Sequence, residues 1–416
     1  MTLAVTWDGE QVGVLERADE RSREYAFTYV QPRRALSLSL PTSTTSFTPA
    51  QSRPFFEALL PEGAVREQIA AQLKLAASDS YGLLAALGRD CAGAIQIYES
   101  RRTSEPWSVE WLDDEGLDEL VRDLPRRPLG VRAGDERLRL SLAGVQRKAV
   151  LVRDRDGRFG QPLNGMPSTH ILKPDPDDSG VPALAINECF CMRLAVACGL
   201  EVAPVELLIL ADRPCLVVTR FDRDLDDAPV RRLHQEDFCQ ALGLTPDFKY
   251  QHEGWEVPSF AAFARLLDDH GVRPGADRLM LAGAAVFNYL IGNADAHAKN
   301  FSLLHEPGGV RMAPLYDLVS TAVYPEVNQD LALEIGDAHH ADAVGHTEWA
   351  DLATDLGLRA RFFAPWRARL ASRVQGTAGV VLAEARAEGW YAPVLEDLVG
   401  LINARAERVR RSVDGD

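Results

Sequence analysis

Long apolar runs are absent from this sequence, and their absence limits where the protein can act. The most apolar stretch, Leu281–Ile291, is interrupted by Asn288 and is shorter than the roughly 20 residues that a membrane-spanning helix requires. The first residues carry neither the basic segment nor the apolar segment of a secretory signal peptide. We therefore expect a cytoplasmic protein that has no membrane partner.

Metal-binding cysteine pairs and an excess of positive charge are absent as well. The six cysteines are scattered and include no C-x-x-C pair, so we expect buried thiols in a reducing compartment rather than a zinc site. With a net charge of −16, the chain would repel a nucleic acid unless basic residues gathered on one face. A basic protein partner is compatible with this charge.

The sequence does contain an ordinary globular composition and a change of pattern along the chain. Its 416 residues, 46% hydrophobic and 25% charged, suffice for two or three domains or for one large bilobal body. Short β-type runs fill the first half, and helical periodicity dominates after about residue 222. This order predicts an α+β protein with a β-rich N-terminal part and a helical C-terminal part.

The expected strands are short runs of apolar and β-branched residues. They cover 3–7, 36–40, 92–98, two runs around a turn within 138–152, 170–173, 205–209, 216–219 and 301–304. Thr48 and Pro49 suit the N-cap and first position of a helix, which we expect to follow them. Further helices are expected at 64–73, 113–122, 187–198, 235–242, 259–270, 277–291, 348–356, 359–374, 378–388 and 395–409.

The loop Gly292–Ser302 is the most informative segment for function. It follows a predicted apolar helix, and the turn-forming residues Gly292 and Asn293 lead into it. Asp295 and Asn300 stand five residues apart, which is the interval between the base and the metal-binding Asn in the catalytic loop of protein kinases. The Asp would accept a hydroxyl proton, and the Asn amide oxygen would face Mg²⁺, which prefers oxygen ligands.

Asp317 supplies a second carboxylate downstream of this loop. Gly308 and Gly309 favour a turn between Asn300 and Asp317, so two strands can return as a hairpin and bring the carboxylate back to the loop. A metal ion that bridges nucleotide phosphates requires such an additional oxygen ligand. Each residue alone is also typical of an ordinary turn, and only their combination favours a kinase-type centre.

Histidines near the loop permit a different interpretation. Asp295, His297 and His305 would suit a metallohydrolase, but no H-x-x-x-H motif accompanies them. In a later histidine group, no cysteine or close carboxylate completes the spacing of a tetrahedral metal site, so a solvated loop is favoured: His339, His340 and His346.

Upstream residues suggest the nucleotide half of the site. Ser141–Lys148 (SLAGVQRK) is a turn of small residues whose backbone amides can approach phosphates, although it lacks the glycine motifs of P-loop proteins and protein kinases. Lys173 ends a predicted strand and would contact ATP phosphates, with Glu188 on the next helix as its ion-pair partner. An ordinary hairpin turn and a lysine at a solvated edge are the alternatives.

Together and in this order, these segments resemble the HipA family of toxin kinases. The resemblance runs through most of the chain and includes its N-terminal region. It is carried by Leu36–Pro41 (LSLSLP), Phe56–Pro61 (FEALLP), Leu87–Gly93 (LGRDCAG), Ser141–Lys148, Thr169–Pro174 (THILKP), Asn187 and Glu188, Arg220–Arg223 (RFDR), Gln235–Gly243 (QEDFCQALG), Gly292–Ser302 (GNADAHAKNFS) and Pro314–Ser320 (PLYDLVS). The set is specific, because no other single family explains all of its members.

The resemblance implies a bilobal, protein-kinase-like α+β fold. It places a HipA-like N-terminal subdomain at 1–105, the remainder of the β-rich N-terminal lobe at 106–222 and a helical C-terminal lobe at 223–416. It also implies a serine/threonine protein kinase that depends on ATP and Mg²⁺.

The resemblance further implies roles for individual residues. Asp295 is the expected catalytic base, and Asn300 and Asp317 are the expected metal ligands. Ser141 matches the family's autophosphorylated serine, whose added negative charge would eject the phosphate loop and stop ATP binding. The residues expected to bind ATP are Ala143, Gly144, Val145, Gln146, Arg147, Lys148, Lys173, the hinge residues Thr219, Arg220 and Phe221, and Gln235, His297, Lys299 and Tyr316.

Two positions depart from the expected pattern. Thr219 stands where a Glu is common in the family, and His297 follows the base where ordinary protein kinases carry a Lys. Metal ions and Lys173, with help from Lys299, would then balance the charge of the transferred phosphoryl group.

The family's partners are a small basic helix-turn-helix antitoxin and, only through that complex, operator DNA. Its protein substrates are aminoacyl-tRNA synthetases. A small-molecule kinase on a related fold and a non-catalytic corepressor of such an antitoxin are the alternatives to a toxin kinase. A labelled-ATP assay on proteins and small alcohols would separate these possibilities.

Overall fold

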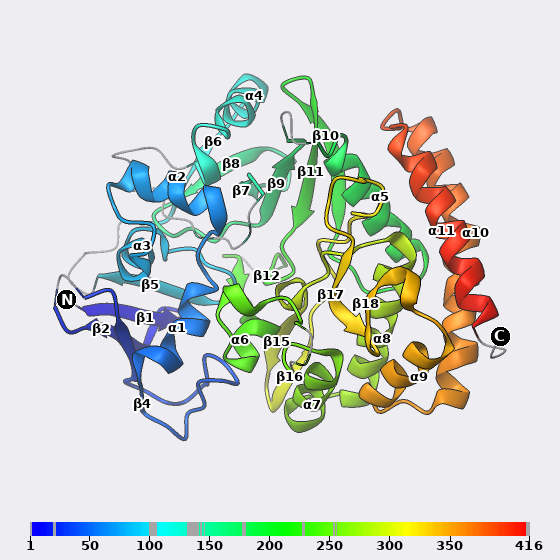
Figure 1. Ribbon diagram of the computed structural model, residues 1–416. Helices are drawn as coiled ribbons and strands as arrows, with labels where there is room; N and C mark the ends of the chain where they lie inside the picture. The colour runs from blue at the N-terminus through cyan, green and yellow to red at the C-terminus, as the bar shows by residue number, and fades with distance from the viewer. Residues whose placement is uncertain are drawn as a thin grey trace. The chain divides into compact units, whose positions relative to one another are not determined.

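The chain forms two compact units. The computed structural model describes residues 2–19, 22–99, 106–130, 141, 144, 146–176, 180–226, 229–252, 254 and 256–412. The first unit comprises Met1–Pro174, Ile209–Arg213 and Val217–Asp247, and the second comprises Asp175–Leu208, Pro214–Leu216 and Phe248–Asp416. The first unit holds most of the strands and the second most of the long helices (Figure 1).

An antiparallel sheet of five strands begins the first unit. Its strands, in the order β4-β3-β2-β1-β5, are Ser46–Phe47, Tyr25–Tyr29, Glu10–Arg17, Thr2–Trp7 and Ile95–Glu99. The register pairs Leu3 with Leu15 and Val5 with Ile97, so these fully buried side chains contribute to one core. The strands expected near residues 3–7 and 92–98 are therefore confirmed.

Three helices pack with this sheet: α1 (Pro49–Glu57), α2 (Gly63–Leu73) and α3 (Ser80–Leu87). The Thr48 side chain caps α1 by accepting the Gln51 N–H group, and the Gln51 side chain accepts the Thr48 N–H group in return. This reciprocal capping box satisfies two donors at the start of the helix and explains why it begins where the sequence predicted. Phe55 and Phe56 then point into the core.

A second sheet contains six strands in the order β10-β11-β9-β7-β8-β6. Their bounds are Val205–Leu210, Arg213–Thr219, His170–Pro174, Ala149–Arg153, Phe159–Leu163 and Ser108–Trp111. Helix α4 (Asp114–Asp123) and the 3₁₀ turn η1 (Pro128–Gly130) precede β7. Short elements complete this part: β12 (Arg223–Asp224), β13 (Arg231–Arg232), β14 (Gln235–Asp237), α6 (Phe238–Leu242) and η2 (Pro246–Phe248).

Helices dominate the second unit. They are α5 (Leu184–Ala197), α7 (Phe260–His270), α8 (Pro274–Ile291), α9 (His346–Asp355), α10 (Ala360–Ala387) and α11 (Val394–Arg411). Helices α10 and α11 lie side by side near the C-terminus, and both pack on the apolar α8 (Figure 1). The unit also holds two small hairpins, β15 (Ser302–Glu306) with β16 (Gly309–Met312) and β17 (Asp330–Ile335) with β18 (Ala338–His340). Its 3₁₀ turns are η3 (Ala298–Asn300) and η4 (Ala341–Ala343).

Three element predictions are wrong. The alternating run 36–40 is a turn closed by a Ser37–Leu40 bridge, because Leu36 and Leu40 are fully buried while Ser37 bonds Glu236 and Ser39 bonds the Gln240 carbonyl. The helices expected at 359–374 and 378–388 are one continuous helix, α10. The helix expected from 235 begins only at Phe238, after strand β14.

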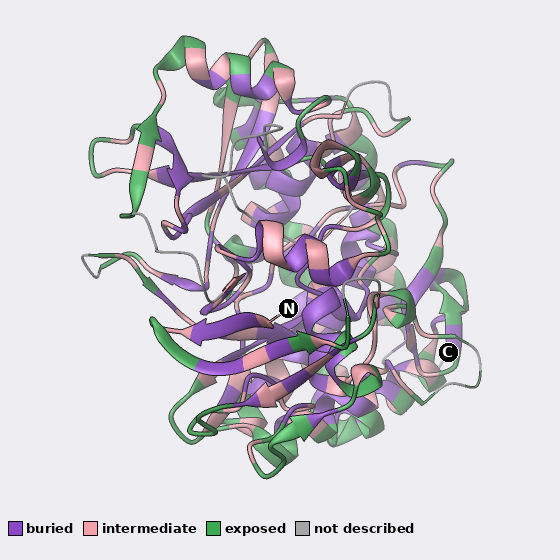
Figure 2. Cartoon of the chain, turned by 90° about the vertical axis from the view of Figure 1, so that its left-hand side faces the viewer, coloured by how far each residue is buried: buried purple, intermediate pink, exposed green. Residues whose placement is uncertain are grey.

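Burial follows the elements. Buried residues concentrate on the strands and on one face of many helices, whereas the most exposed residues lie in turns, in some loops and on the outer faces of helices (Figure 2). All six cysteines are buried free thiols. Among the described residues, no helix is both long and apolar enough to traverse a bilayer. The first of the two strands expected within 138–152 lies outside the described residues, and the second is β7.

Candidate active site

The predicted catalytic loop begins at a sharp turn after α8. Gly292 ends the helix with a φ of 75°, a left-handed conformation that glycine adopts without steric cost. A side chain there would collide with Leu401 and Ala322, which lie 2.6 and 2.7 Å from the position of a Cβ atom. The loop is therefore pressed against two neighbouring segments at its first residue.

Asp295 and Asn300 are arranged around the backbone of this loop. Asn293 Oδ1 accepts the Asp295 N–H group at 3.2 Å, and the Asp295 side chain is exposed. Asn300 Nδ2 donates to the Asp295 carbonyl at 3.2 Å. Because its amide nitrogen is engaged in this way, the amide oxygen of Asn300 is the atom available to a cation.

The predicted hairpin after this loop is confirmed. Strands β15 and β16 pair Leu303 with Met312 and Glu306 with Gly309, and the chain returns along the loop. The Tyr316 hydroxyl donates to the Lys299 carbonyl at 2.7 Å and lies 2.7 Å from Ser302 Oγ. The residue directly before Asp317 is thus fixed to the residue directly before Asn300.

Asp317 itself has an unusual backbone. Its φ of 57° lies in the left-handed region, which non-glycine residues adopt rarely and mainly where the surroundings enforce it. The Asn293 side chain donates to the Asp317 carbonyl at 3.5 Å. Asn187 of α5 holds the following turn, because its amide accepts the Ser320 N–H group and donates to the Ser320 carbonyl, both at 2.9 Å.

These contacts bring the Asp317 segment and the catalytic loop together within the second unit. An amide oxygen and a carboxylate on adjoining segments are a donor set that suits a hard cation such as Mg²⁺. Within the described ranges, by contrast, no group of three or more His, Cys, Asp and Glu side chains is arranged to hold a metal. His305 instead lies in β15 opposite Val310, and the His340 ring accepts the Asp342 N–H group.

Tyr250 was not recognised from the sequence, yet it touches the predicted base. Its hydroxyl donates to Asp295 Oδ1 at 3.0 Å, and its ring packs edge-on against the His297 ring, with centroids 5.3 Å apart. Asn187 and Asn293 were likewise given no role in the site. These contacts join residues that are 24 to 133 positions apart, which periodicity and local motifs do not reveal.

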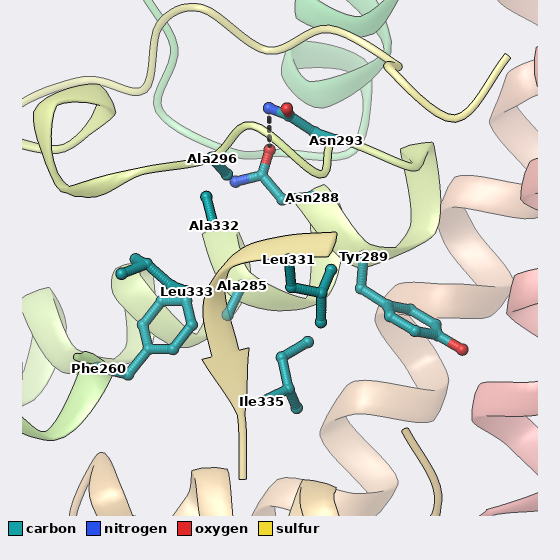
Figure 3. A pocket seen from close by; sticks show the side chains of 10 residues that line it. All are labelled: Phe260, Ala285, Asn288, Tyr289, Asn293, Ala296, Leu331, Ala332, Leu333 and Ile335. Carbon is teal, nitrogen blue, oxygen red and sulfur yellow. Dashed lines mark hydrogen bonds between the residues drawn. The ribbon is translucent and has the colours of Figure 1, made fainter. Parts of the chain in front are cut away.

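A small cavity, large enough for no more than a water-sized group, lies behind the loop in the second unit. Figure 3 shows Asn288 and Asn293 directed towards each other at its rim, where Asn293 Nδ2 donates to Asn288 Oδ1 at 2.9 Å. Its remaining lining is mostly apolar: Phe260, Ala285, Tyr289, Ala296, Leu331, Ala332, Leu333 and Ile335. The cavity is smaller than a usual ligand site, so we interpret it as imperfect packing behind the loop.

The first unit carries the residues predicted for the phosphate loop. Ser141 is fully buried, its N–H group donates to the Asp90 carbonyl at 3.0 Å, and its hydroxyl donates to the Leu59 carbonyl at 2.6 Å. Gly144 has a φ of 106°, and Lys148 Nζ lies 2.8 Å from the position of a Cβ atom there. Gln146 is partly buried and Arg147 is exposed. The predictions for Ala143 and Val145 fall outside the described residues.

The two residues of the predicted ion pair are both buried. Lys173 lies on β9 in the first unit, and Glu188 lies on α5 in the second. Their pairing and their role towards ATP stay predictions. His297 and Lys299 in the catalytic loop are also largely buried.

The predicted hinge has one residue whose side chain is already engaged. Arg220 Nη2 lies 2.7 Å from Asp222 Oδ2, and its Nη1 donates to Ser168 Oγ at 2.9 Å, so only its backbone can face a nucleotide. Thr219 ends β11, and Phe221 is partly buried. Gln235 begins β14, and its Oε1 atom is buried without a hydrogen-bond partner among the described residues.

Arg220 belongs to a buried ion cluster, which we define as Asp90, Arg220, Asp222, Arg223 and Arg232. Asp90 Oδ1 lies 3.0 Å from Arg223 and 3.1 Å from Arg232, and its Oδ2 accepts the Ser168 hydroxyl at 2.6 Å. Burial by itself would raise the pKa of the Asp90 carboxyl, but Arg223, Arg232 and Arg220 outweigh burial and lower this pKa. The pKa of the Asp222 carboxyl is lowered for the same reason.

Two family models match this chain. The model described as "HipA N-terminal domain" matches residues 3–98, and the model described as "HipA-like C-terminal domain" matches residues 140–378. Together they span both the N-terminal sheet and the catalytic loop.

Similar proteins agree with this match. The protein Y4mE of Sinorhizobium fredii is 40% identical over 428 residues, covering 99% of this chain and 97% of Y4mE. The serine/threonine-protein kinase toxin HipA of Shewanella oneidensis is 31% identical over 376 residues, covering 88% of this chain and 85% of that protein. A solved structure of the Shewanella oneidensis HipA, HipB and operator DNA complex contains a chain with a TM-score of 0.82, 28% identity and complete coverage of both chains. The α+β fold expected from the sequence is thereby confirmed.

Proposed function

Because the chain belongs to the HipA family of kinases, we propose that it is the toxin of a toxin–antitoxin pair and transfers the γ-phosphoryl group of ATP to a serine or threonine hydroxyl of a protein. The observation that carries this proposal is the pair of contacts that join the Asp317 segment to the catalytic loop. One joins Tyr316 to the Lys299 carbonyl and the other joins Asn293 to the Asp317 carbonyl. They hold the segments that carry Asp295, Asn300 and Asp317 next to one another, which supports the assignment of these residues to one site.

Each residue of this region has a distinct task. The Asp295 carboxylate accepts a hydrogen bond from the acceptor hydroxyl, orients its oxygen towards the phosphorus atom and takes up its proton as the new bond forms. Asn300 and Asp317 would hold Mg²⁺ through their oxygens. A bound Mg²⁺ would supply positive charge against the negative charge that develops on the transferred phosphoryl group. Lys173 adds positive charge at the nucleotide phosphates.

Autophosphorylation at Ser141 would switch the kinase off. The Ser141 hydroxyl donates to the Leu59 carbonyl in a fully buried position. A phosphate group cannot fit there, because it adds close to two negative charges and three acceptor oxygens beside a backbone carbonyl. Phosphorylated Ser141 would therefore leave this position and take the phosphate loop with it.

We propose the partner and the substrate of this chain by analogy with its family. The Shewanella oneidensis relative forms a complex with HipB and operator DNA. We propose that this chain binds a small basic helix-turn-helix protein of that kind in the cytoplasm and contacts DNA only through it. The net charge of −16 favours such a basic partner. An aminoacyl-tRNA synthetase is the proposed substrate.

A phosphorylation screen tests this function. Purified aminoacyl-tRNA synthetases are incubated with Mg²⁺, [γ-³²P]ATP and either the wild-type chain or the Asp295→Ala variant. We expect label on a serine or threonine with wild type and a loss of at least about 10³-fold with Asp295→Ala, which should still bind ATP in calorimetry. The control variant Asp351→Ala removes another exposed carboxylate of the second unit and should retain full activity. Equal labelling by wild type and Asp295→Ala would rule out the proposed base.

A further inference from the structure

Tyr250 lies beside the predicted base Asp295. Its hydroxyl donates to Asp295 Oδ1 at 3.0 Å, and its side chain is about one-third exposed, at 37%. A hydrogen bond to a carboxylate is charge-assisted and therefore stronger than one between neutral groups. Asp295 is exposed as well, so the hydrogen bond from Tyr250 restrains the rotation of a carboxylate that lies at the surface.

The segment that carries Tyr250 is tied to the catalytic loop on both sides. Before it, the Lys249 carbonyl accepts the Ala298 N–H group at 3.0 Å. After it, the Gln251 N–H group donates to the Ala332 carbonyl at 2.8 Å, and the Ala332 N–H group in turn donates to the Ala294 carbonyl at 2.8 Å. The tyrosine therefore keeps a fixed relation to the loop residues on either side of Asp295.

The Tyr250 ring adds a third restraint. It packs edge-on against His297, with an angle of 78° between the ring planes. Edge-to-face pairs of this kind contribute stability beyond the area that they bury. An alternative role for Tyr250 is that of a side chain that the protein substrate displaces from Asp295. The packing of its ring on His297 and the hydrogen bonds of the flanking backbone oppose such a displacement.

We propose that Tyr250 is a positioning residue for phosphoryl transfer. Its hydroxyl holds Oδ1 of Asp295, so the second carboxylate oxygen is directed to the hydroxyl of the protein acceptor and receives its proton. This inference rests on the proposed kinase function and adds a residue that no motif in the loop contains. It separates two tasks: the carboxylate reacts, and the tyrosine sets its rotation.

The test compares Tyr250→Phe with a matched control. Tyr391→Phe removes the same type of bond, since the Tyr391 hydroxyl donates to Glu396 Oε1 at 2.6 Å and this tyrosine is 36% exposed. The initial rate of ADP formation is measured over a series of Mg-ATP concentrations, and ³²P incorporation into the chain is followed in parallel. We expect Tyr250→Phe to lower kcat about 10-fold with the KM for ATP unchanged, because small misplacements of a reacting group cost roughly this much or more. Tyr391→Phe should change neither value.

A double variant distinguishes positioning from a structural role. In an Asp295→Asn background, the further change Tyr250→Phe should leave the residual rate unaltered, because the group that it positions is already lost. A wild-type kcat in Tyr250→Phe, a higher kcat, or an equal loss in kcat and in ATP affinity would each overturn the inference. If wild type forms no ADP above the Asp295→Ala level, the proposed function itself fails. If wild type is active and Asp295→Ala is not, only the inference is at stake.

Discussion

The buried ion cluster of the first unit and the catalytic loop of the second unit hold their carboxylates in opposite ways. Asp90 is inaccessible to solvent at its side chain and is surrounded by three guanidinium groups. Asp295 is exposed and is held by the hydroxyl of Tyr250. One carboxylate is neutralised by fixed cations, and the other remains accessible to an incoming hydroxyl group.

Buried charges and exposed carboxylates therefore differ in what they contribute to stability. Charges withdrawn from water require partners that remain in place, so removing one partner from the ion cluster leaves the others uncompensated. An exposed carboxylate has no such dependence and can be replaced with little change in stability. We therefore expect variants of the ion cluster to alter stability first, and variants of the catalytic loop to alter activity first.

After the loss expected in Asp295→Ala, the largest expected effect is also on activity and comes from Asp317→Asn. Asparagine tolerates the left-handed backbone at this position about as well as aspartate, so the fold should persist while the charge at the proposed metal site is lost. We expect phosphoryl transfer to fall about 10²–10³-fold and added Mg²⁺ not to restore it fully. The control Asp330→Asn changes an exposed carboxylate of β17 and should be neutral. An active Asp317→Asn variant would remove this residue from the metal site.

The second effect concerns stability. Asp90→Ala should lower the free energy of unfolding by about 3–5 kcal/mol, because it leaves three buried arginines with one carboxylate, that of Asp222. Urea unfolding of the whole chain measures this loss. The surface variant Asp123→Ala removes only a half-exposed pair with Arg127 and should cost less than about 1 kcal/mol. Equal costs for the two variants would refute the comparison between buried and exposed charges.

A smaller effect is expected from Asn187→Ala, which removes both hydrogen bonds to the backbone of Ser320. The loss of stability should be about 1–3 kcal/mol, since the buried N–H and C=O groups of Ser320 lose their partner. Because the same turn follows Asp317, half-maximal activity should also require more Mg²⁺. The variant Asn187→Asp keeps an acceptor for the Ser320 N–H group but buries a carboxylate whose second oxygen faces the Ser320 carbonyl, so it should not restore the lost stability. An unchanged Mg²⁺ requirement would show that this turn does not position Asp317.

The smallest effect is a dependence of stability on acid pH. The pKa values of the Asp90 and Asp222 carboxyls are lowered in the folded protein, whereas an unfolded Asp has a pKa of about 3.9. Their contribution is therefore fully present above about pH 4 and is lost as the pH falls through the lowered values. Between pH 4 and pH 2, the free energy of unfolding should decrease less steeply in Asp90→Ala than in wild type. Parallel pH profiles would argue against the cluster as a source of acid sensitivity.

Features that depend on residues close together in the sequence could be predicted from it. The end of α8 at Gly292 and the loop that follows it were predictable, because an apolar helical pattern and a turn-forming glycine are adjacent in the sequence, whereas the catalytic role of the loop stays a prediction. The hairpin to Asp317 was predictable from Gly308 and Gly309 for the same reason. Local chemistry of this type appears directly in the order of residues.

Contacts between residues far apart in the sequence could not be predicted from it. The ion cluster joins Asp90 to Arg223 and Arg232 across more than 130 positions, and Arg220 was assigned to a hinge without any sign of its buried partners. The LSLSL run has the alternation of a strand and was therefore predicted as one. It is a turn instead, because its serines bond the Glu236 side chain and the Gln240 carbonyl some 200 positions away. Tyr250 escaped notice because a single tyrosine after a short turn carries no pattern.

A crystal structure of the chain with Mg²⁺ and a non-hydrolysable ATP analogue would test the proposed metal and nucleotide site most directly. We predict a metal ion bound by the Asn300 amide oxygen and the Asp317 carboxylate, with the γ-phosphate facing Asp295. A metal ion coordinated elsewhere, or a nucleotide whose γ-phosphate lies away from Asp295, would contradict it.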